Sequence, residues 1–217
     1  FYAEPLNGIF LYSFLFLITL GCLMWFTSRQ KDLPLNISDG FIITTMFWVV
    51  LAFAGSIPFY FFGLNASDAI FESVSGITTT GATVIVGLDE LPKSLLLYRQ
   101  LLQWIGGMGL IILAVAVMPT LGIGGGQLYK MELPGSHGNQ KLTPKITDSA
   151  KALWKIYFGL TIICALLYLL SGMNLFDAIA HSLSTVAGGG FSTHDDSIGF
   201  FNSGLIETVC IIFMLLS

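Results

Sequence analysis

The sequence predicts an all-α, polytopic membrane protein in which one structural unit occurs twice. Three observations lead to this fold class. Of the 217 residues, 54% are hydrophobic and only 10% are charged, a balance too apolar for an ordinary soluble domain. The apolar residues are gathered into long stretches, and a segment that follows the second of these stretches recurs after the fourth.

Four apolar stretches approach or reach the ~20 residues that a helix needs to cross a bilayer. They are residues 8–26, 41–62, 95–118 and 152–170, and a fifth apolar stretch covers 205–216. The first is not a signal peptide, because no basic region precedes it and no small-residue cleavage site follows it. Since the sequence begins without Met and ends in an apolar stretch, we expect a fragment that is truncated at both ends.

The basic residues predict the orientation of these stretches. Seven of the nine Lys and Arg residues follow the first stretch or lie in and beside the loop after the third: Arg29, Lys31, Lys130, Lys141, Lys145, Lys151 and Lys155. By the positive-inside rule this side is cytoplasmic. Segments 63–94 and 171–204 then lie outside, where their acidic residues would raise the local cation concentration.

These two outer segments contain the internal repeat. Residues 63–75 (GLNASDAIFESVS) and 172–184 (GMNLFDAIAHSLS) share seven of thirteen positions, and the same register pairs Gly81 with Gly190. Both copies follow a stretch that runs outward and precede a segment that starts inward again. The sequence therefore predicts two copies of one unit.

Each copy opens with the signals of a helix N-terminus. Asn65 and Asn174 are good N-caps, and Asp68 and Asp177 follow three residues later in a capping-box-like arrangement that also complements the helix dipole. The first helix is predicted from residue 66 to about residue 78, some 12 residues or roughly 18 Å at 1.5 Å per residue. Such a helix is too short to cross a bilayer, so we expect it to enter the membrane and return.

The stretches after these helices, 77–83 (ITTTGAT) and 186–192 (VAGGGFS), are poor helix formers. Non-helical backbone at membrane depth is tolerated only where it is buried in protein or lines a water-filled path. A half-helix followed by an extended loop of this kind is the pore-loop pattern of potassium channels, in which backbone carbonyls replace the hydration shell of the ion. The negative C-terminal end of each short helix would also favour a cation.

Three motifs carry a resemblance to a known family: 75–83 (SGITTTGAT), 98–109 (YRQLLQWIGGMG) and 189–195 (GGFSTHD). With the repeated order of span, pore helix, filter loop and span, they resemble the Trk/Ktr/HKT potassium transporter superfamily and, within it, the bacterial TrkH family. The resemblance covers essentially the whole chain. It implies potassium uptake by a multi-pass protein of the bacterial inner membrane, with the pore loops facing outside and no enzyme activity.

The resemblance also implies a division of the chain. Residues 1–38 would hold the terminal helix of an extra N-terminal pair and a cytoplasmic loop. Residues 39–120 would be the first pore-loop repeat, 121–148 a cytoplasmic linker, and 149–217 the second repeat, incomplete. In that family four repeats surround one pore, so the third and fourth would be missing here.

By the same resemblance, K⁺ is the transported ion, with no other cofactor. The selectivity filter would bind it through carbonyl oxygens at six positions: Thr79, Thr80, Gly81, Gly188, Gly189 and Gly190. A lipid bilayer, a homodimer and a cytoplasmic nucleotide-binding subunit of the TrkA type are the implied partners, and no nucleic acid is expected. The sequence leaves open a channel or a proton- or sodium-coupled symport mechanism, the gating, and the selectivity for potassium over sodium.

Several residues are predicted to support the pore loops. Arg99 lies inside an apolar stretch, where charges are costly and often functional, and we expect it to pair with Glu72 or Asp68. The alternatives are that Arg99 snorkels to the outer interface or acts on the ion directly. Asp68 and Asp177 are also candidates for support, and the small residues of 106–109 are expected to pack against a pore helix.

The sequence allows two other functions. An intramembrane, metal-dependent enzyme would use a cluster of four residues that lacks zinc-ligand spacing: His181, His194, Asp195 and Asp196. A non-conducting membrane scaffold is the other alternative. The glycine-rich stretch 122–126 predicts a loop rather than a nucleotide site, because no Lys-Ser/Thr pair follows it.

Overall fold

The computed structural model describes residues 7–27, 37–117 and 143–216. In this part of the chain the elements are helices and loops, in the order α1 (Asn7–Thr27), α2 (Ile37–Phe62), α3 (Ala66–Ile77), η1 (Leu88–Glu90), α4 (Lys93–Val117), α6 (Thr143–Leu170), α7 (Leu175–Val186), η2 (Ser197–Phe201) and α8 (Gly204–Leu216). The predicted all-α fold class is confirmed. The glycine-rich stretch 122–126 lies outside the described residues, as do Arg29, Lys31, Lys130 and Lys141.

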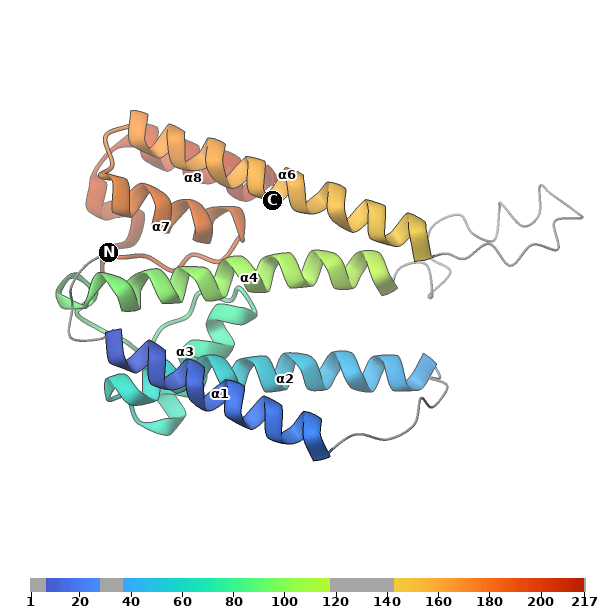
Figure 1. The fold of residues 1–217 in the computed structure, drawn as a ribbon. Helices are drawn as coiled ribbons and strands as arrows, with labels where there is room; N and C mark the ends of the chain where they lie inside the picture. Colours follow the sequence, from blue (N-terminus) through green and yellow to red (C-terminus); the bar gives the residue numbers. More distant parts are fainter. Residues whose placement is uncertain (1–6, 28–36, 118–142, 217) are drawn as a thin grey trace, which may run out of the picture.

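The predicted spans correspond to the long helices α1, α2, α4 and α6. Three apolar segments in the described residues are long enough to cross a membrane: Gly8–Thr27, Thr44–Phe62 and Lys151–Leu170. Figure 1 shows α1 and α4 running in one direction and α2 and α6 in the opposite one, which is the alternation that the charges predict. α6 begins at Thr143, earlier than predicted, because hydropathy marks only the lipid-crossing part of a helix whose polar end continues beyond it.

The two short helices, α3 and α7, have 12 residues each and are capped as predicted. Asn65 Oδ1 accepts a hydrogen bond from the Asp68 backbone N–H at 3.0 Å, and Asn174 Oδ1 accepts one from the Asp177 N–H at 2.9 Å. The amide of each Asn donates in return to the Asp carboxylate, at 2.7 and 2.6 Å. The first helix ends at Ile77 and Thr78 is its C-cap, so its extent is close to the predicted 66–78.

Removing one of these caps is expected to destabilise the protein modestly. Asn65→Ala deletes the acceptor for the first turn of α3 and should lower the free energy of unfolding by about 1 kcal/mol. The measurement is chemical unfolding of the detergent-solubilised protein. Asn65→Ser, which keeps an acceptor oxygen, should recover most of the loss, and equal losses for the two variants would contradict the capping role.

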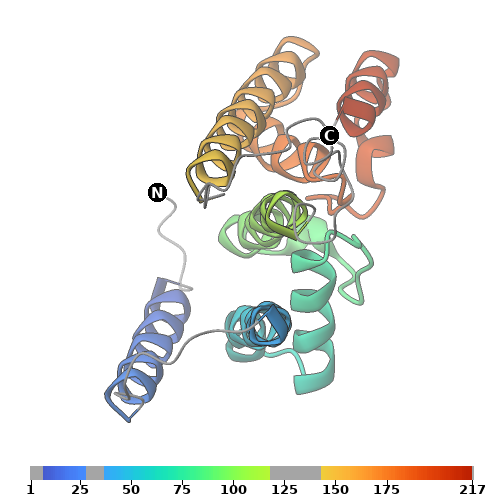
Figure 2. The same cartoon turned by 90° about the vertical axis from the view of Figure 1, so that its right-hand side faces the viewer.

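α4 lies at the centre of the fold, between two groups of helices (Figure 2). On one side α2 and α3 pack with α4 around Phe59, Ala69, Ile77, Leu95 and Leu102. On the other side, a second cluster from α4, α6, α7 and α8 includes Met108, Tyr157, Tyr168, Val186 and Ile206. The last long helix of the first repeat therefore belongs to the cores of both repeats.

Candidate functional site

The loops after α3 and α7 leave their helices in the same way. The Thr80 backbone N–H donates to the Ser75 carbonyl at 2.9 Å, and the Gly189 N–H donates to the Ser184 carbonyl at 3.0 Å. These residues are equivalent in the register of the internal repeat. Beyond them the chain is not helical, through 80–87 in the first copy and 189–192 in the second.

The backbone angles of the two loops agree as well. Thr79 and its equivalent Gly188 have φ angles of 55° and 65°, and Gly81 and its equivalent Gly190 have φ angles of 76° and 98°. Glycine adopts this left-handed region freely, whereas a β-branched residue such as Thr79 does so only under strain. The loops thus share an unusual conformation, although they share few residues.

The two loops also touch one another. A Cβ atom placed on Gly81 would overlap the carbonyl oxygen of Gly189. A Cβ atom placed on Gly189 would overlap the side-chain amide of Gln103 in α4. Two of the predicted filter ligands, one from each copy, are therefore brought together in a space that admits only glycine at Gly81 and Gly189.

One arginine connects the two loops. The Arg99 guanidinium is fully buried; it donates through Nη2 to Thr83 Oγ1 at 2.9 Å and through Nη1 to the Ser192 carbonyl at 3.2 Å. Thr83 and Ser192 are equivalent residues of the two copies. Arg99 Nε lies 3.4 Å from Glu72 Oε2, so the charge is paired with Glu72 and not with Asp68. Because its guanidinium is fully buried, Arg99 does not snorkel to the outer interface.

Glu72 and His181 occupy equivalent positions on the two short helices and hold equivalent loop residues. Glu72 Oε1 accepts hydrogen bonds from the Thr83 hydroxyl and, at 2.8 Å, from the Val84 N–H. In the second copy His181 Nε2 is hydrogen-bonded to the Ser192 hydroxyl at 3.0 Å. A carboxylate and an imidazole therefore fix the same point of the loop in each copy.

Gln103 is a supporting residue that the sequence analysis missed. Its Oε1 accepts a hydrogen bond from the Ser184 hydroxyl at 2.7 Å and another from the Phe191 N–H at 3.1 Å, and the side chain is fully buried. A signal was present in the sequence. Gln103 is an amide inside an apolar stretch, four residues after Arg99 and hence on the same face of the helix.

The glycines of α4 let the helix approach both short helices, as expected. A Cβ on Gly106 would overlap the carbonyl group of Ile77, the last residue of α3. A Cβ on Gly107 would come within 3.2 Å of Ala187, which caps the end of α7. Gly106 and Gly107 thus pack against the two short helices and bring α4 next to the start of both loops, whereas Gly109 faces Trp48 of α2.

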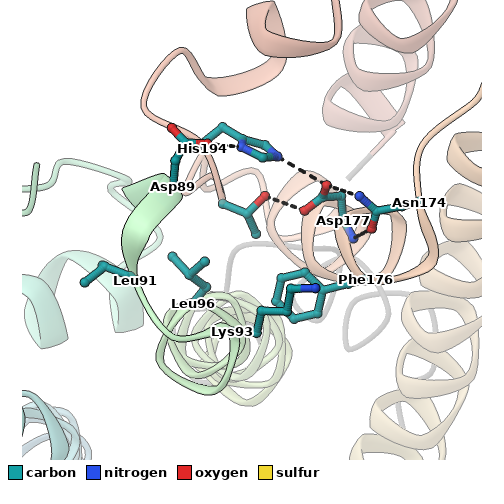
Figure 3. A pocket seen from close by; sticks show the side chains of 9 residues that line it. Asp89, Leu91, Lys93, Leu96, Asn174, Phe176, Asp177 and His194 are labelled. Carbon is teal, nitrogen blue, oxygen red and sulfur yellow. Dashed lines mark hydrogen bonds and ion pairs between the residues drawn. The ribbon is translucent and has the colours of Figure 1, made fainter. Parts of the chain in front are cut away.

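The histidine and aspartate side chains of the second copy are engaged with one another and with η1. His194 contacts Asp89 through Nδ1 and lies 3.2 Å from Asp177 Oδ2 through Nε2 (Figure 3). Asp195 accepts hydrogen bonds from the N–H groups of Gly87 and Leu88, at 3.0 and 3.1 Å. The hydrogen bond from His194 holds the pKa of Asp89 below its ordinary value.

The four residues of the alternative metal-dependent enzyme, His181, His194, Asp195 and Asp196, are not arranged as a metal site among the described residues. Within the described ranges, no group of three or more His, Cys, Asp or Glu side chains is arranged to hold a metal ion. Asp68, which was predicted to support a pore loop, is bonded within its own N-cap. Asp177 reaches further, because its Oδ1 also accepts a hydrogen bond from Thr193 at 2.7 Å, just after the second loop.

The chain is similar to proteins of one family. Residues 8–217 match the family described as "TrkH: Cation transport protein". Over its whole length the chain is 54% identical to the Trk system potassium uptake protein TrkH of Vibrio parahaemolyticus and 49% identical to that of Escherichia coli K12. The chain spans 45% of the length of each of these curated relatives.

A solved structure gives the same result for the fold. The crystal structure of the potassium transporter TrkH from Vibrio parahaemolyticus matches with a TM-score of 0.85 and 49% sequence identity. The match covers 99% of this chain and 43% of that one.

Proposed function

Because the chain belongs to the TrkH family of cation transport proteins, we propose that it carries two pore loops of a potassium-uptake protein of the bacterial cytoplasmic membrane. The names of the relatives, which are potassium uptake proteins, support this function. Apolar helices long enough to cross a membrane support the location. The two short capped helices and their loops would face the outside.

The observation that carries the proposal is the shared backbone of the two loops and their contact at Gly81 and Gly189. Positive φ angles at every second residue, Thr79 then Gly81 and Gly188 then Gly190, allow successive carbonyl groups to turn to one side. Carbonyl oxygens in such an arrangement can replace the hydration shell of K⁺. The proposed ligands are the carbonyls of Thr79, Thr80, Gly81, Gly188, Gly189 and Gly190.

The organisation of the chain follows from this proposal. Residues 39–120 and 149–217 are two pore-loop repeats, 121–148 is a cytoplasmic linker, and 1–38 precedes the first repeat. α4 supports the division, because this helix ends the first repeat and packs against the second. A homodimer and a nucleotide-binding subunit of the TrkA type are the partners that we propose from family membership.

Substitution of the first filter glycine tests the proposal. We expect Gly81→Ser to lower the preference for potassium over sodium about tenfold, because the new Cβ overlaps the Gly189 carbonyl and a left-handed non-glycine residue adds strain of about 1–3 kcal/mol. The measurement is ion flux through the full-length protein in proteoliposomes.

Gly87→Ser is the matched control. Gly87 also has a positive φ, of 78°, but a Cβ there meets open space. This variant should keep its selectivity while bearing similar backbone strain. An unchanged potassium preference in Gly81→Ser would refute the filter assignment.

A further inference from the structure

A second site lies outside the two loops, where the outer segments of the repeats meet. We propose that Asp89, His194 and Asp177, here called the outer clasp, form an external proton-binding site that joins the two repeats when the proton is bound. The inference goes beyond ion conduction. It depends on the topology, which places these segments outside, and not on which ion the filter selects.

The geometry of the clasp connects the two copies through a single ring. Asp89 lies in η1, after the first loop, and Asp177 lies in the first turn of α7, before the second loop. The His194 ring stands between them, with Nδ1 on Asp89 and Nε2 on Asp177, as Figure 3 shows. The His194 side chain is only 15% exposed, and a cavity of about 150 Å³ beside it is lined by all three residues.

The chemistry of imidazole makes this arrangement proton-dependent. A neutral ring carries one N–H, so its other nitrogen presents a lone pair, which repels a carboxylate oxygen. Only the imidazolium ion donates from both nitrogens at once. With both of its hydrogen bonds formed, the clasp therefore holds one more proton than a neutral histidine and two carboxylates do.

The carboxylates are arranged to remain ionised while that proton is bound. Burial raises the pKa of Asp177, but hydrogen bonds from Thr193, His194 and Asn174 outweigh it, and the net pKa is lowered. The pKa of Asp89 is lowered by its bond to His194. The extra proton thus belongs on the ring, which leaves two charge-assisted hydrogen bonds across the junction.

Basic, acidic and aromatic side chains surround His194. On α7, the His181 ring stacks at 6.4 Å between centroids, and on α4 Lys93 lines the same cavity with its ammonium group 5.3 Å from the Phe176 ring centroid. Asp195 and Asp196 follow His194 directly in the chain. On η2, Phe200 stacks on the ring at 3.5 Å, a face-on contact that favours a cation.

The sign of the pH effect follows from the proton count. The clasp holds its extra proton at low external pH and gives it up as the external pH rises. Loss of the proton leaves one ring nitrogen facing a carboxylate without a hydrogen, so one half of the clasp opens. The hydrogen bonds from Gly87 and Leu88 to Asp195 then hold this segment without the full clasp. They open more often, although η1 does not detach.

Hydrogen–deuterium exchange of the full-length protein in lipid nanodiscs tests the inference. We expect the protection factors of the backbone amides of residues 87–90, corrected for intrinsic exchange, to fall about threefold to tenfold as the pH rises from 5 to 8. Amides in the core of α6 should show no such change. Because the readout requires no transport, it is independent of the filter test.

Two variants separate the clasp from other pH effects. His194→Gln cannot bind the proton and should show low protection of residues 87–90 at every pH. Asp89→Asn presents an amide that can donate to the neutral ring, so protection should stay high and independent of pH. Unchanged exchange in the unmodified protein, or pH dependence that persists in His194→Gln, would overturn the inference.

A direct titration covers the case in which a variant fails to fold. The ¹³Cε1 signal of His194, assigned in the labelled wild-type protein by selective labelling, should change with pH together with the protection of residues 87–90. A ring that titrates without any change in that protection would show that His194 binds a proton but holds nothing together.

Discussion

Glu72→Met is expected to lower the free energy of unfolding by about 3–5 kcal/mol, because it leaves the Arg99 charge buried without its partner. Both side chains are fully buried, and arginine cannot shed its proton to escape the cost. The variant also removes the acceptor for the Thr83 hydroxyl and the Val84 N–H, so the first loop loses its anchor. The measurement is chemical unfolding of the solubilised protein.

The double variant Glu72→Met/Arg99→Met separates charge from packing. Two apolar side chains of similar volume leave no unpaired charge, so the double variant should be clearly more stable than Glu72→Met alone. The two loops should still be disturbed, because Arg99 no longer connects Thr83 with Ser192. Stability that falls additively in the double variant would contradict a buried ion pair.

Gly106→Ala is expected to cost about 2–3 kcal/mol, through overpacking at the contact between α4 and α3. The added methyl group would overlap the carbonyl of Ile77, a backbone group that cannot rotate away. α4 must then shift from the end of α3, which should also lower the preference for potassium over sodium. Thermal unfolding and ion flux measure the two effects.

Gly159→Ala in α6 is the control for this substitution. A Cβ at Gly159 meets no atom within 4 Å, and alanine is the better helix former by up to about 1 kcal/mol. This variant should therefore be as stable as the original protein or slightly more stable. If Gly106→Ala behaves in the same way, the two helices are not in close contact at that point.

The sequence predicted those features that depend on neighbours in the chain. The long helices follow from apolar stretches of membrane length, and the N-caps of α3 and α7 follow from an Asn and an Asp three residues apart. The non-helical loops were predicted from their threonine and glycine content. Each of these rests on local interactions, which a linear pattern records directly.

Pairings between side chains of separate elements could not be predicted as well. The sequence allowed Arg99 to pair with Glu72 or Asp68, and only the fold selected Glu72. It offered His181, His194, Asp195 and Asp196 only as an alternative site without metal-ligand spacing, and it did not show that His194 contacts Asp89 and Asp177. The role of Gln103, which bonds directly to the second loop, was not predicted.

By itself, the sequence determined the helices, their caps, the alternating direction of the long helices and the presence of two equivalent loops. The tertiary structure alone decided which side chains hold those loops together. The bonds from Phe191 to Gln103 and from Arg99 to Ser192 join residues 88 and 93 positions apart, and the contact of His194 with Asp89 joins residues 105 apart. Such partners meet only because α4 packs against both short helices, and no local pattern encodes the distance between separate helices.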